Sequence, residues 1–453
     1  MSVKRQYFGT DGIRGRTGQG AITPEFTLKL GWAVGQLLQK EKGRGAVLIG
    51  KDTRISGDML TASLTAGFIA AGLEVQLLGT LPTPAVAYLT RALGAQMGVV
   101  VSASHNPYYD NGIKFFCAQG KKLPDEMESK IEALLSHPMT TVNSQEMGCV
   151  RYLNEASNYY IAFCKKAFLP AYTLNGLTLV IDCSNGATSE VAPEIFSELG
   201  AQVIAIHHQP DGFNINEQCG STHPQALQEA VLAHQADLGI AFDGDGDRVI
   251  LVDHQGEIVD GDEIVYVIAQ GYQARKALTG GVVGTQMSNL GLENALKALN
   301  IDFMRTQVGD RYVLEGLHQR GWQIGGEASG HILCLDKSST GDGILSALQV
   351  LGEMCHSNRS LHELKKGMAK CAQILLNVPV ENGAHIIHHE TIQRLYQQAE
   401  SALLSKGRIL LRPSGTEPLM RVMVEGEDES LISQVAHMLA EGIEQVAKNL
   451  QTI

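Results

Sequence analysis

VVVSASHNPYYDNGIKFF, residues 99–116, is the stretch around which the chain is organised. The apolar, β-branched residues at its start predict a buried strand over residues 98–101. The NP and DNG sequences that follow are typical of turns, and a second strand should come after them. Ser104 is the first hydroxyl on the expected exposed turn, and His105 follows it directly. Strand ends in α/β proteins often carry ligand contacts, although a plain Asn-Pro turn with a solvated serine fits the same residues.

Length and composition restrict the class of protein. The chain has 453 residues and a net charge of −12, which argues against a general nucleic-acid surface. A cleft with its own positive field still admits small anionic ligands. No apolar run reaches the roughly 18 residues of a membrane-spanning helix, and the N-terminus lacks a hydrophobic signal core. We therefore expect a cytoplasmic protein without nucleic-acid or membrane partners.

The cysteines indicate neither a zinc site nor a disulfide framework. There are eight of them, and none falls in a C-x-x-C pair. Most are expected to be reduced side chains that pack in the interior.

Three segments repeat one pattern: a strand, a small polar loop, an amphipathic helix, a helix stop and another strand. They span residues 46–78, 177–206 and 281–304. Each is a βαβ unit, and its parallel strands imply a sheet covered by helices. Beyond about residue 366 the pattern becomes a strand, a helix, two strands joined by a turn, and a long helix.

The sequence therefore predicts an α/β fold. It should contain three similar βαβ-containing α/β domains, followed by a smaller α+β C-terminal domain, arranged around a central cleft. The expected domains are residues 1–154, 155–258, 259–367 and 368–453.

An acidic loop, DGDGDR, follows an apolar run in the second domain. Carboxylates at alternate positions, separated by glycine, can bend onto one hard cation, and their oxygens suit Mg²⁺ or Ca²⁺. We therefore predict that Asp243, Asp245 and Asp247 hold one metal ion. A calcium EF-hand loop would need Gly and Glu where this chain has Arg248 and His254. A phosphatase with Asp243 as nucleophile, and an ordinary acidic turn, are the other interpretations.

Two more loops combine glycine with polar side chains. FGTDGIRG, residues 8–15, carries Arg14, and arginine forms bidentate contacts with phosphate. GGEASGH, residues 325–331, places Glu327 and Ser329 two residues apart, so they point the same way if the segment is locally extended. Such a pair suits sugar hydroxyls. Each loop alone also fits a solvated turn.

A last loop, LRPSGTEPLMR at residues 411–421, joins two expected strands. Its hydroxyls and backbone N–H groups offer a concavity that can bind an anion, and an arginine flanks it on each side. A plain hairpin turn is the alternative. The residues expected to hold the anion are Arg412, Ser414, Gly415, Thr416 and Arg421.

Five motifs in this order resemble the α-D-phosphohexomutase family: FGTDGIRG, SASHNP, DGDGDR, GEASGH and RPSGTEP. The resemblance extends from Phe8 to near the C-terminus, with at least one motif in each expected domain. The first motif and SASHNPYYDNGIKFF are most similar to family members that act on glucosamine phosphates. Those members commonly carry Gln or Asn where this chain has Ala328, so selectivity among glucosamine, glucose and mannose phosphates stays open.

The resemblance implies a role for each motif. Ser104 would carry the transferable phosphoryl group and, as phosphoserine, would hold one Mg²⁺ per chain together with the three aspartates. Arg14, His105 and Lys114 would lie near the transferring group, and either Lys114 or His105 would help move protons. The remaining residues would bind the sugar and its second phosphate: Arg248, Glu327, Ser329, Arg412, Ser414, Gly415, Thr416 and Arg421.

The implied reaction interconverts glucosamine 6-phosphate and glucosamine 1-phosphate, which supplies UDP-N-acetylglucosamine synthesis. Glucosamine 1,6-bisphosphate would serve as intermediate and activator, and the partner is a small hexosamine phosphate. A phosphomannomutase or phosphoglucomutase of the same family, and a non-catalytic sugar-phosphate sensor, are the alternatives. A homodimer is also compatible with the sequence.

Overall fold

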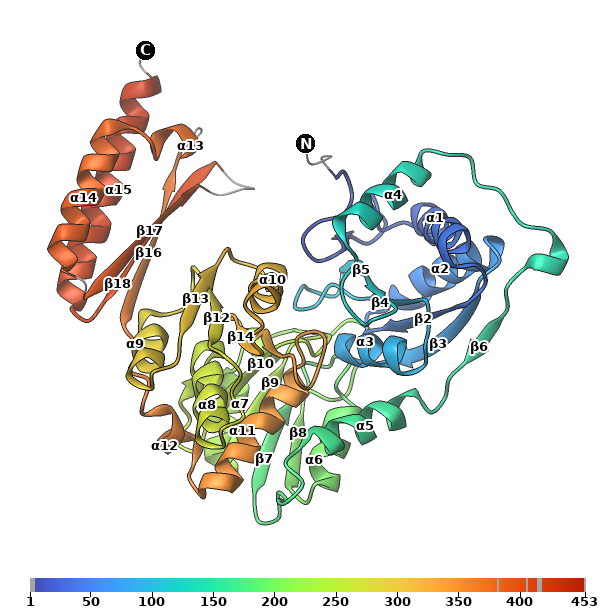
Figure 1. Ribbon diagram of the computed structural model, residues 1–453, viewed down its shortest axis with the longest axis horizontal. Helices are drawn as coiled ribbons and strands as arrows, with labels where there is room; N and C mark the ends of the chain where they lie inside the picture. Colours follow the sequence, from blue (N-terminus) through green and yellow to red (C-terminus); the bar gives the residue numbers. More distant parts are fainter. Residues whose placement is uncertain (1–4, 381–382, 405, 414–417, 452–453) are drawn as a thin grey trace. The chain divides into compact units, whose positions relative to one another are not determined.

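The computed structural model describes residues 5–380, 383–404, 406–413 and 418–451. The chain divides into two compact units, which are described separately (Figure 1). Unit 1 comprises Met1–Thr285 and Thr306–Lys365, and unit 2 comprises Gln286–Arg305 and Lys366–Ile453. Within the described ranges, no helix combines the length and the apolar character needed to cross a bilayer.

The first sheet of unit 1 has six strands: β1 (Ile13–Arg16), β2 (Ala46–Lys51), β3 (Glu74–Thr80), β4 (Met97–Val101), β5 (Asp110–Cys117) and β6 (Val150–Tyr152). Their order is β1-β5-β4-β2-β3-β6 (Figure 1). Strands β2, β3, β4 and β6 pair in parallel, whereas β5 runs antiparallel to β1 and β4. Every residue of β4 is buried, as expected for an apolar strand in the middle of a covered sheet.

The second sheet has five strands: β7 (Thr178–Asp182), β8 (Gln202–Ile206), β9 (Leu238–Phe242), β10 (Val249–Asp253) and β11 (Ile258–Val259). Their order is β11-β10-β9-β7-β8, with β7, β8 and β9 parallel and β10 antiparallel to its neighbours. A third sheet contains β12 (Val282–Thr285), β14 (Ile324–Gly326) and β15 (Ile332–Cys334). Here β12 and β14 are parallel and β15 is antiparallel. Strand β13 (Phe303–Thr306) begins in unit 2 and ends in unit 1.

Helices between the strands of unit 1 supply the rest of its core. Helix α8, for example, begins at a capping box in which Asp260 and Glu263 satisfy each other's backbone N–H groups. The helices are α1 (Pro24–Lys42), α2 (Gly57–Ala70), α3 (Thr83–Ala92), α4 (Asp125–Leu135), α5 (Ala156–Ala167), α6 (Val191–Glu198), α7 (Gln225–His234), α8 (Gly261–Ala274), α10 (Asp310–Arg320), α11 (Gly343–Ser357) and α12 (Leu361–Lys365), with 3₁₀ turns η1 (Ser144–Glu146) and η2 (Gly220–Thr222).

Unit 2 contains an antiparallel sheet in the order β16-β18-β17, against which α14 and α15 pack (Figure 1). Alternate residues of the strands and one face of each helix form its core, which includes Val422, Val424, Leu439 and Ile443. Its elements are α9 (Leu290–Ala298), β16 (Ala372–Pro379), α13 (Gly383–Ile386), α14 (Glu390–Leu403), β17 (Gly407–Pro413), β18 (Leu419–Gly426) and α15 (Glu429–Gln451).

The predicted fold class is confirmed: three βαβ-containing segments precede a smaller α+β segment. The sheets are nevertheless mixed rather than parallel throughout. Strands β5, β10 and β15 each return antiparallel beside a strand of a βαβ unit. The strand expected after the NP and DNG turns is present as β5. The antiparallel returns of β10 and β15 were not expected, because their hairpin geometry follows from no local residue pattern.

A buried hydrogen bond links α5 to the residue that precedes α11. Tyr160 Oη donates to Asp342 Oδ2 at 2.9 Å, and both side chains are buried. Asp342 also caps α11, because its Oδ1 accepts from Leu345 N at 2.9 Å. Burial raises the pKa of the Asp342 carboxyl to about 7, although these hydrogen bonds favour its charged form.

We expect Asp342→Asn to flatten the dependence of stability on pH. In the unfolded chain this carboxyl has its ordinary pKa near 3.8, so between about pH 4 and 7 the folded state binds the extra proton. Its contribution to stability therefore falls as pH rises through that window. From pH 5 to pH 8, the wild type should lose roughly 2 kcal/mol more unfolding free energy than the variant. Urea unfolding of both proteins at the two pH values measures the difference, and parallel slopes would contradict the assignment.

Candidate active site

Three of the five sequence motifs lie on the tips of hairpins in unit 1. SASHNP joins β4 to β5, DGDGDR joins β9 to β10, and the end of GGEASGH joins β14 to β15. Backbone hydrogen bonds also link the loops: Val249 N donates to Gly330 O at 3.1 Å, and Thr83 N donates to Asp245 O at 2.8 Å. Sequence-distant loops therefore meet at one place.

Ser104 lies at the centre of this place. Its Oγ donates to Asp243 Oδ2 at 2.6 Å and lies 3.3 Å from His105 Nδ1. We expected Ser104 to lie on an exposed turn, and this expectation is wrong, because the residue is only 1% exposed. The DGDGDR hairpin and neighbouring loops cover it. Its φ of 54° places it in the left-handed region, which non-glycine residues seldom occupy.

The three aspartates of DGDGDR form a buried group beside Ser104. One ligand oxygen from each lies within 4.8 Å of the others. Burial, and then the charges of Asp247 and Asp245, raise the pKa of Asp243 well above its usual value. Asp245 Oδ1 and Asp247 Oδ1 are buried without a hydrogen-bond partner among the described residues. A carboxylate-only set with unsatisfied inward oxygens fits a Mg²⁺-sized cation.

Two other groups of ionisable residues within the described ranges have the spacing of metal ligands, and neither fits Mg²⁺ as well. Asp182 lies with His207 and Cys219, and nitrogen and sulfur suit softer metals than Mg²⁺. Asp253 lies with Glu257 and His362, which offers a nitrogen ligand in place of the oxygen that Mg²⁺ prefers. The Asp243 group therefore remains the best candidate for a hard cation.

Lys114, on β5, is the main cation in contact with the aspartates. Its Nζ lies 2.8 Å from Asp245 Oδ2, 3.1 Å from Asp247 Oδ2 and 3.1 Å from Asp11 Oδ2, and the side chain is only 3% exposed. Burial disfavours its charge, but Asp11, Asp245 and Asp247 together hold the Lys114 pKa well above its ordinary value. Lys114 is therefore an ammonium ion that partly neutralises the acidic group.

Arg14, Arg248 and His105 surround the same centre. The Nε atoms of both arginines are buried without a hydrogen-bond partner among the described residues, although Arg14 also pairs with Asp11. Burial, and then the positive charges of Arg248 and Arg14, lower the pKa of His105 to about 4. The imidazole is therefore neutral at pH 7, in a field that favours anions.

Glu327 and Ser329 do not have the extended geometry that we expected. Gly330 N donates to Glu327 O at 2.9 Å, which closes a tight turn, and Gly330 has a φ of 90° that suits glycine. Glu327 is half-buried and accepts from Gly309 N at 2.9 Å, whereas Ser329 is exposed. The same loop contributes His331, whose Nδ1 lies 3.6 Å from Asp247 Oδ1.

The expected phosphate-binding residues belong to unit 2. Arg412 of β17 and Arg421 of β18 are directly opposite each other in the antiparallel ladder, so both flank the joining loop. Ser414, Gly415 and Thr416 lie outside the described residues.

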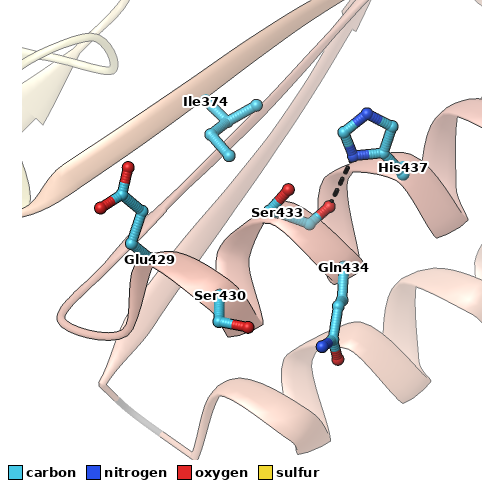
Figure 2. Close-up of a pocket in the computed structure, with 6 residues that line it drawn as sticks. All are labelled: Ile374, Glu429, Ser430, Ser433, Gln434 and His437. Atoms are coloured by element: carbon cyan, nitrogen blue, oxygen red, sulfur yellow. Dashed lines mark hydrogen bonds between the residues drawn. The ribbon is translucent and has the colours of Figure 1, made fainter.

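Two hollows complete the description. One of about 440 Å³ lies next to the Ser104 turn and is lined by His105, Tyr108, Tyr109, Phe213 and Asn216, among others. The other, of about 660 Å³, lies on unit 2 along the first turns of α15 (Figure 2). None of the predicted site residues lines the second hollow, and the hydrogen bond drawn there joins His437 Nδ1 to the Ser433 carbonyl within one helix. Of these two hollows, the first adjoins the candidate site.

The sequence analysis did not single out several residues that complete the site. Asp11 pairs with Lys114, Lys122 and Arg14, and Thr83 Oγ1 donates to Asp245 Oδ2 at 2.6 Å. Asp11 lies inside FGTDGIRG and was visible as a charged residue in a glycine-rich loop. Thr83 has no comparable signal, because it reaches the site only through the packing of α3 against the second sheet's loop.

Four family models match the chain, one after another. They are the phosphoglucomutase/phosphomannomutase alpha/beta/alpha domains I, II and III, at residues 5–141, 157–256 and 260–371, and the C-terminal domain, at residues 375–442. The chain belongs to the phosphoglucomutase/phosphomannomutase family, the α-D-phosphohexomutases.

Within this family, the predicted likeness to bacterial phosphoglucosamine mutases is confirmed. The phosphoglucosamine mutase of Thioalkalivibrio sulfidiphilus is 57% identical over 448 residues, covering 98% of this chain and 99% of the relative. A family protein from Burkholderia thailandensis has a similar structure, with a TM-score of 0.82 at 22% identity and 97% coverage of both chains. Aspergillus fumigatus N-acetylphosphoglucosamine mutase, solved with GlcNAc-6P and magnesium, has a TM-score of 0.68 at 18% identity, covering 98% of this chain and 96% of that one. Both structural matches reflect a shared fold.

Proposed function

We propose that the protein interconverts glucosamine 6-phosphate and glucosamine 1-phosphate, with Ser104 as the carrier of the phosphoryl group. The observation that carries this proposal is the Ser104 hydroxyl 2.6 Å from Asp243, in a buried group of three carboxylates. The 57% identity to a phosphoglucosamine mutase over nearly the whole chain supports the choice of substrate. The enzyme is thus an isomerase of amino sugar metabolism, and its product supplies UDP-N-acetylglucosamine synthesis in the cytoplasm.

The cycle has two half-reactions. In the first, the 1-hydroxyl of glucosamine 6-phosphate attacks the phosphorus of phosphorylated Ser104, and the bond from phosphorus to Oγ breaks. The resulting glucosamine 1,6-bisphosphate turns end for end, so that its 6-phosphate faces Ser104. In the second, Oγ attacks that phosphate and glucosamine 1-phosphate leaves. The proton lost by each attacking hydroxyl returns to the oxygen of the departing group. His105, neutral and 3.3 Å from Oγ, is our candidate for handling that proton.

Asp243, Asp245 and Asp247 would hold one Mg²⁺ together with the phosphorylated Ser104. When bound, this ion would neutralise charge on the transferring group. Lys114 balances Asp245 and Asp247 from β5. The Nε atoms of Arg14 and Arg248 have no hydrogen-bond partner among the described residues and could donate to phosphate oxygens. Lys114 is assigned as a counter-ion because its Nζ contacts three carboxylates, those of Asp11, Asp245 and Asp247.

Substrate binding would involve residues of both units. Glu327 and Ser329 would bind sugar hydroxyls from their turn. Arg248 directly precedes Val249, whose N donates to Gly330 O of the same loop at 3.1 Å. The phosphate that does not react would be held by Arg412, Ser414, Gly415, Thr416 and Arg421. The opposed positions of Arg412 and Arg421 in the β17–β18 ladder support this role.

A comparison of mutase rates on glucosamine, glucose and mannose 6-phosphates, each with Mg²⁺ and the matching 1,6-bisphosphate, tests the function. We expect the highest kcat/KM for the glucosamine phosphate. A preference for glucose or mannose phosphate would instead assign the phosphoglucomutase or phosphomannomutase reaction. Ligand binding without turnover would indicate a sugar-phosphate sensor, and inorganic phosphate as the main product would indicate a phosphatase that uses Asp243.

A further inference from the structure

The peptide units on both sides of Ser104 are held by side chains, and those on its carbonyl come from other segments. Ser104 N donates to Ser102 Oγ at 2.9 Å. The Ser104 carbonyl accepts two hydrogen bonds at 2.9 Å, one from Arg54 Nη2 and one from Asn216 Nδ2. Two donors that converge on one carbonyl fix the peptide plane. A left-handed serine persists only where its surroundings impose that conformation, and these bonds supply the constraint.

Arg54 is the larger of the two donors. It precedes α2, is 1% exposed, and uses its whole guanidinium within the protein. Its Nη atoms donate to carbonyls of the Ser104 turn, and its Nε donates to Asp52 Oδ2 at 2.9 Å. The carbonyls it contacts are those of Ser104, Asn106, Pro107 and Asp110. Arg54 therefore ties the whole turn to the end of β2.

Asn216 reaches the same turn from the other sheet. It lies on the loop after β8, and its Nδ2 donates to Ser104 O at 2.9 Å and to Asn106 O at 3.1 Å. Its own φ is 59°, and its backbone N donates to Ser184 O at 2.9 Å. A Cβ on Gly244 would lie 2.7 Å from both Ser104 O and Asn216 Nδ2, so the acidic loop also passes directly over this contact. Asn216 thus links the serine turn to the sheet that carries the aspartates.

We infer that Arg54 and Asn216 are positioning residues for phosphoryl transfer. They fix the carbonyl of Ser104 and thereby aim its Oγ at Asp243. The inference rests on the proposed function, because it assigns the purpose of the contact to the transfer step. Neither side chain touches Oγ, so both act through the backbone of Ser104. A displaced Oγ would slow the in-line attack, whereas binding of the sugar phosphate by other residues would continue.

Asn216→Gly is the sharpest test, because it removes the side chain that donates to Ser104 O, and glycine adopts a left-handed φ without strain. The matched control is Asn185→Gly. Asn185 is also buried, also left-handed with a φ of 47°, and its Nδ2 donates to Asn214 O rather than to the Ser104 turn. We expect Asn216→Gly to lower kcat about 10- to 100-fold while KM changes less than about threefold. Asn185→Gly should keep the wild-type kcat.

The half-reaction gives a second, independent measurement. Dephosphorylated protein is mixed with glucosamine 1,6-bisphosphate and Mg²⁺, and intact mass follows the phosphoryl group onto Ser104. In this step a sugar P–O bond breaks, a bond to Oγ forms, and the Oγ proton returns to the sugar oxygen. Asn216→Gly should slow it by the same factor as kcat. Asn216→Asp keeps the shape of the side chain but replaces the donating Nδ2 by an oxygen that faces two carbonyls. This variant should slow the half-reaction at least as much.

The two possible failures are distinguishable. If wild-type protein takes no phosphoryl group from the bisphosphate, the proposed function is wrong and the inference falls with it. If the wild type is phosphorylated at Ser104 and Asn216→Gly reacts as fast as Asn185→Gly, the function stands and only the positioning role is rejected. Equal losses of kcat in the two glycine variants, with equally lowered melting temperatures, would also reject it in favour of a general structural role.

Discussion

Ser104→Ala is expected to lower kcat by about 10⁴-fold or more, the largest effect of any single substitution considered for this protein. The reason is that the proposed cycle passes every phosphoryl group through Oγ, and alanine offers no atom to carry it. Binding of the sugar phosphate should persist, since the binding groups remain. Mutase rates with glucosamine 6-phosphate, Mg²⁺ and added bisphosphate measure the loss, and intact mass should show no added phosphate.

Ser104→Ala could lose activity through the missing hydroxyl or through a changed backbone conformation, because Ser104 has a φ of 54° and alanine is strained there. Ser104→Gly removes the hydroxyl without that strain, and should be equally inactive. Ser184→Ala is the matched control. Ser184 is buried, has a φ of 51°, and follows the end of β7 as Ser104 follows the end of β4. It should remain active, and near-normal rates in either Ser104 variant would exclude a phosphoserine mechanism.

Asp245→Asn is expected to lower Mg²⁺-dependent turnover about 10³-fold. Asp245 Oδ1 is buried without a hydrogen bond among the described residues, and an amide would remove a charge from the only all-carboxylate group of three found there. The half-saturating Mg²⁺ concentration should rise together with the loss of rate. Titration of the rate with Mg²⁺, and isothermal titration of Mg²⁺ binding, measure both effects.

Asp58→Asn provides the control for this substitution. Asp58 is an exposed carboxylate that pairs with Lys51 away from the aspartate group, so its removal should leave the Mg²⁺ dependence unchanged. If the Mg²⁺ titration of Asp245→Asn matched that of the wild type, the cation would bind elsewhere. The acidic loop would then be an ordinary turn.

Much of the architecture follows from local patterns in the sequence. The strands that become β2, β4, β7 and β9 are short apolar runs, which bury on both faces of a covered sheet. The helices of the βαβ units have an apolar face, and the sequence marks the residues at which they end. The return strands could not be predicted in the same way, because the register and direction of β10 or β15 depend on hairpin geometry rather than on the residues within the strand.

The candidate site, like the fold, could be predicted from the sequence only in part. Ser104 and the three aspartates stand out because unusual residue types follow apolar strands, and the structure brings them into one place. The burial of Ser104 was not foreseen, since it depends on contacts with sequence-distant segments that carry Arg54, Asn216 and Asp243. Arg54, Asn216 and Thr83 reach the site through tertiary packing alone, and no spacing in the sequence connects them to it.

The hairpin placement of the three motif loops has a consequence for how such a protein tolerates change. Each loop is anchored at both ends by the hydrogen-bond ladder of two adjacent strands, not by a helix. Divergence can therefore accumulate on the outer helical layers while the reacting groups keep their spacing. A lineage could remodel its exterior, acquire new contacts there, and still inherit the same chemistry.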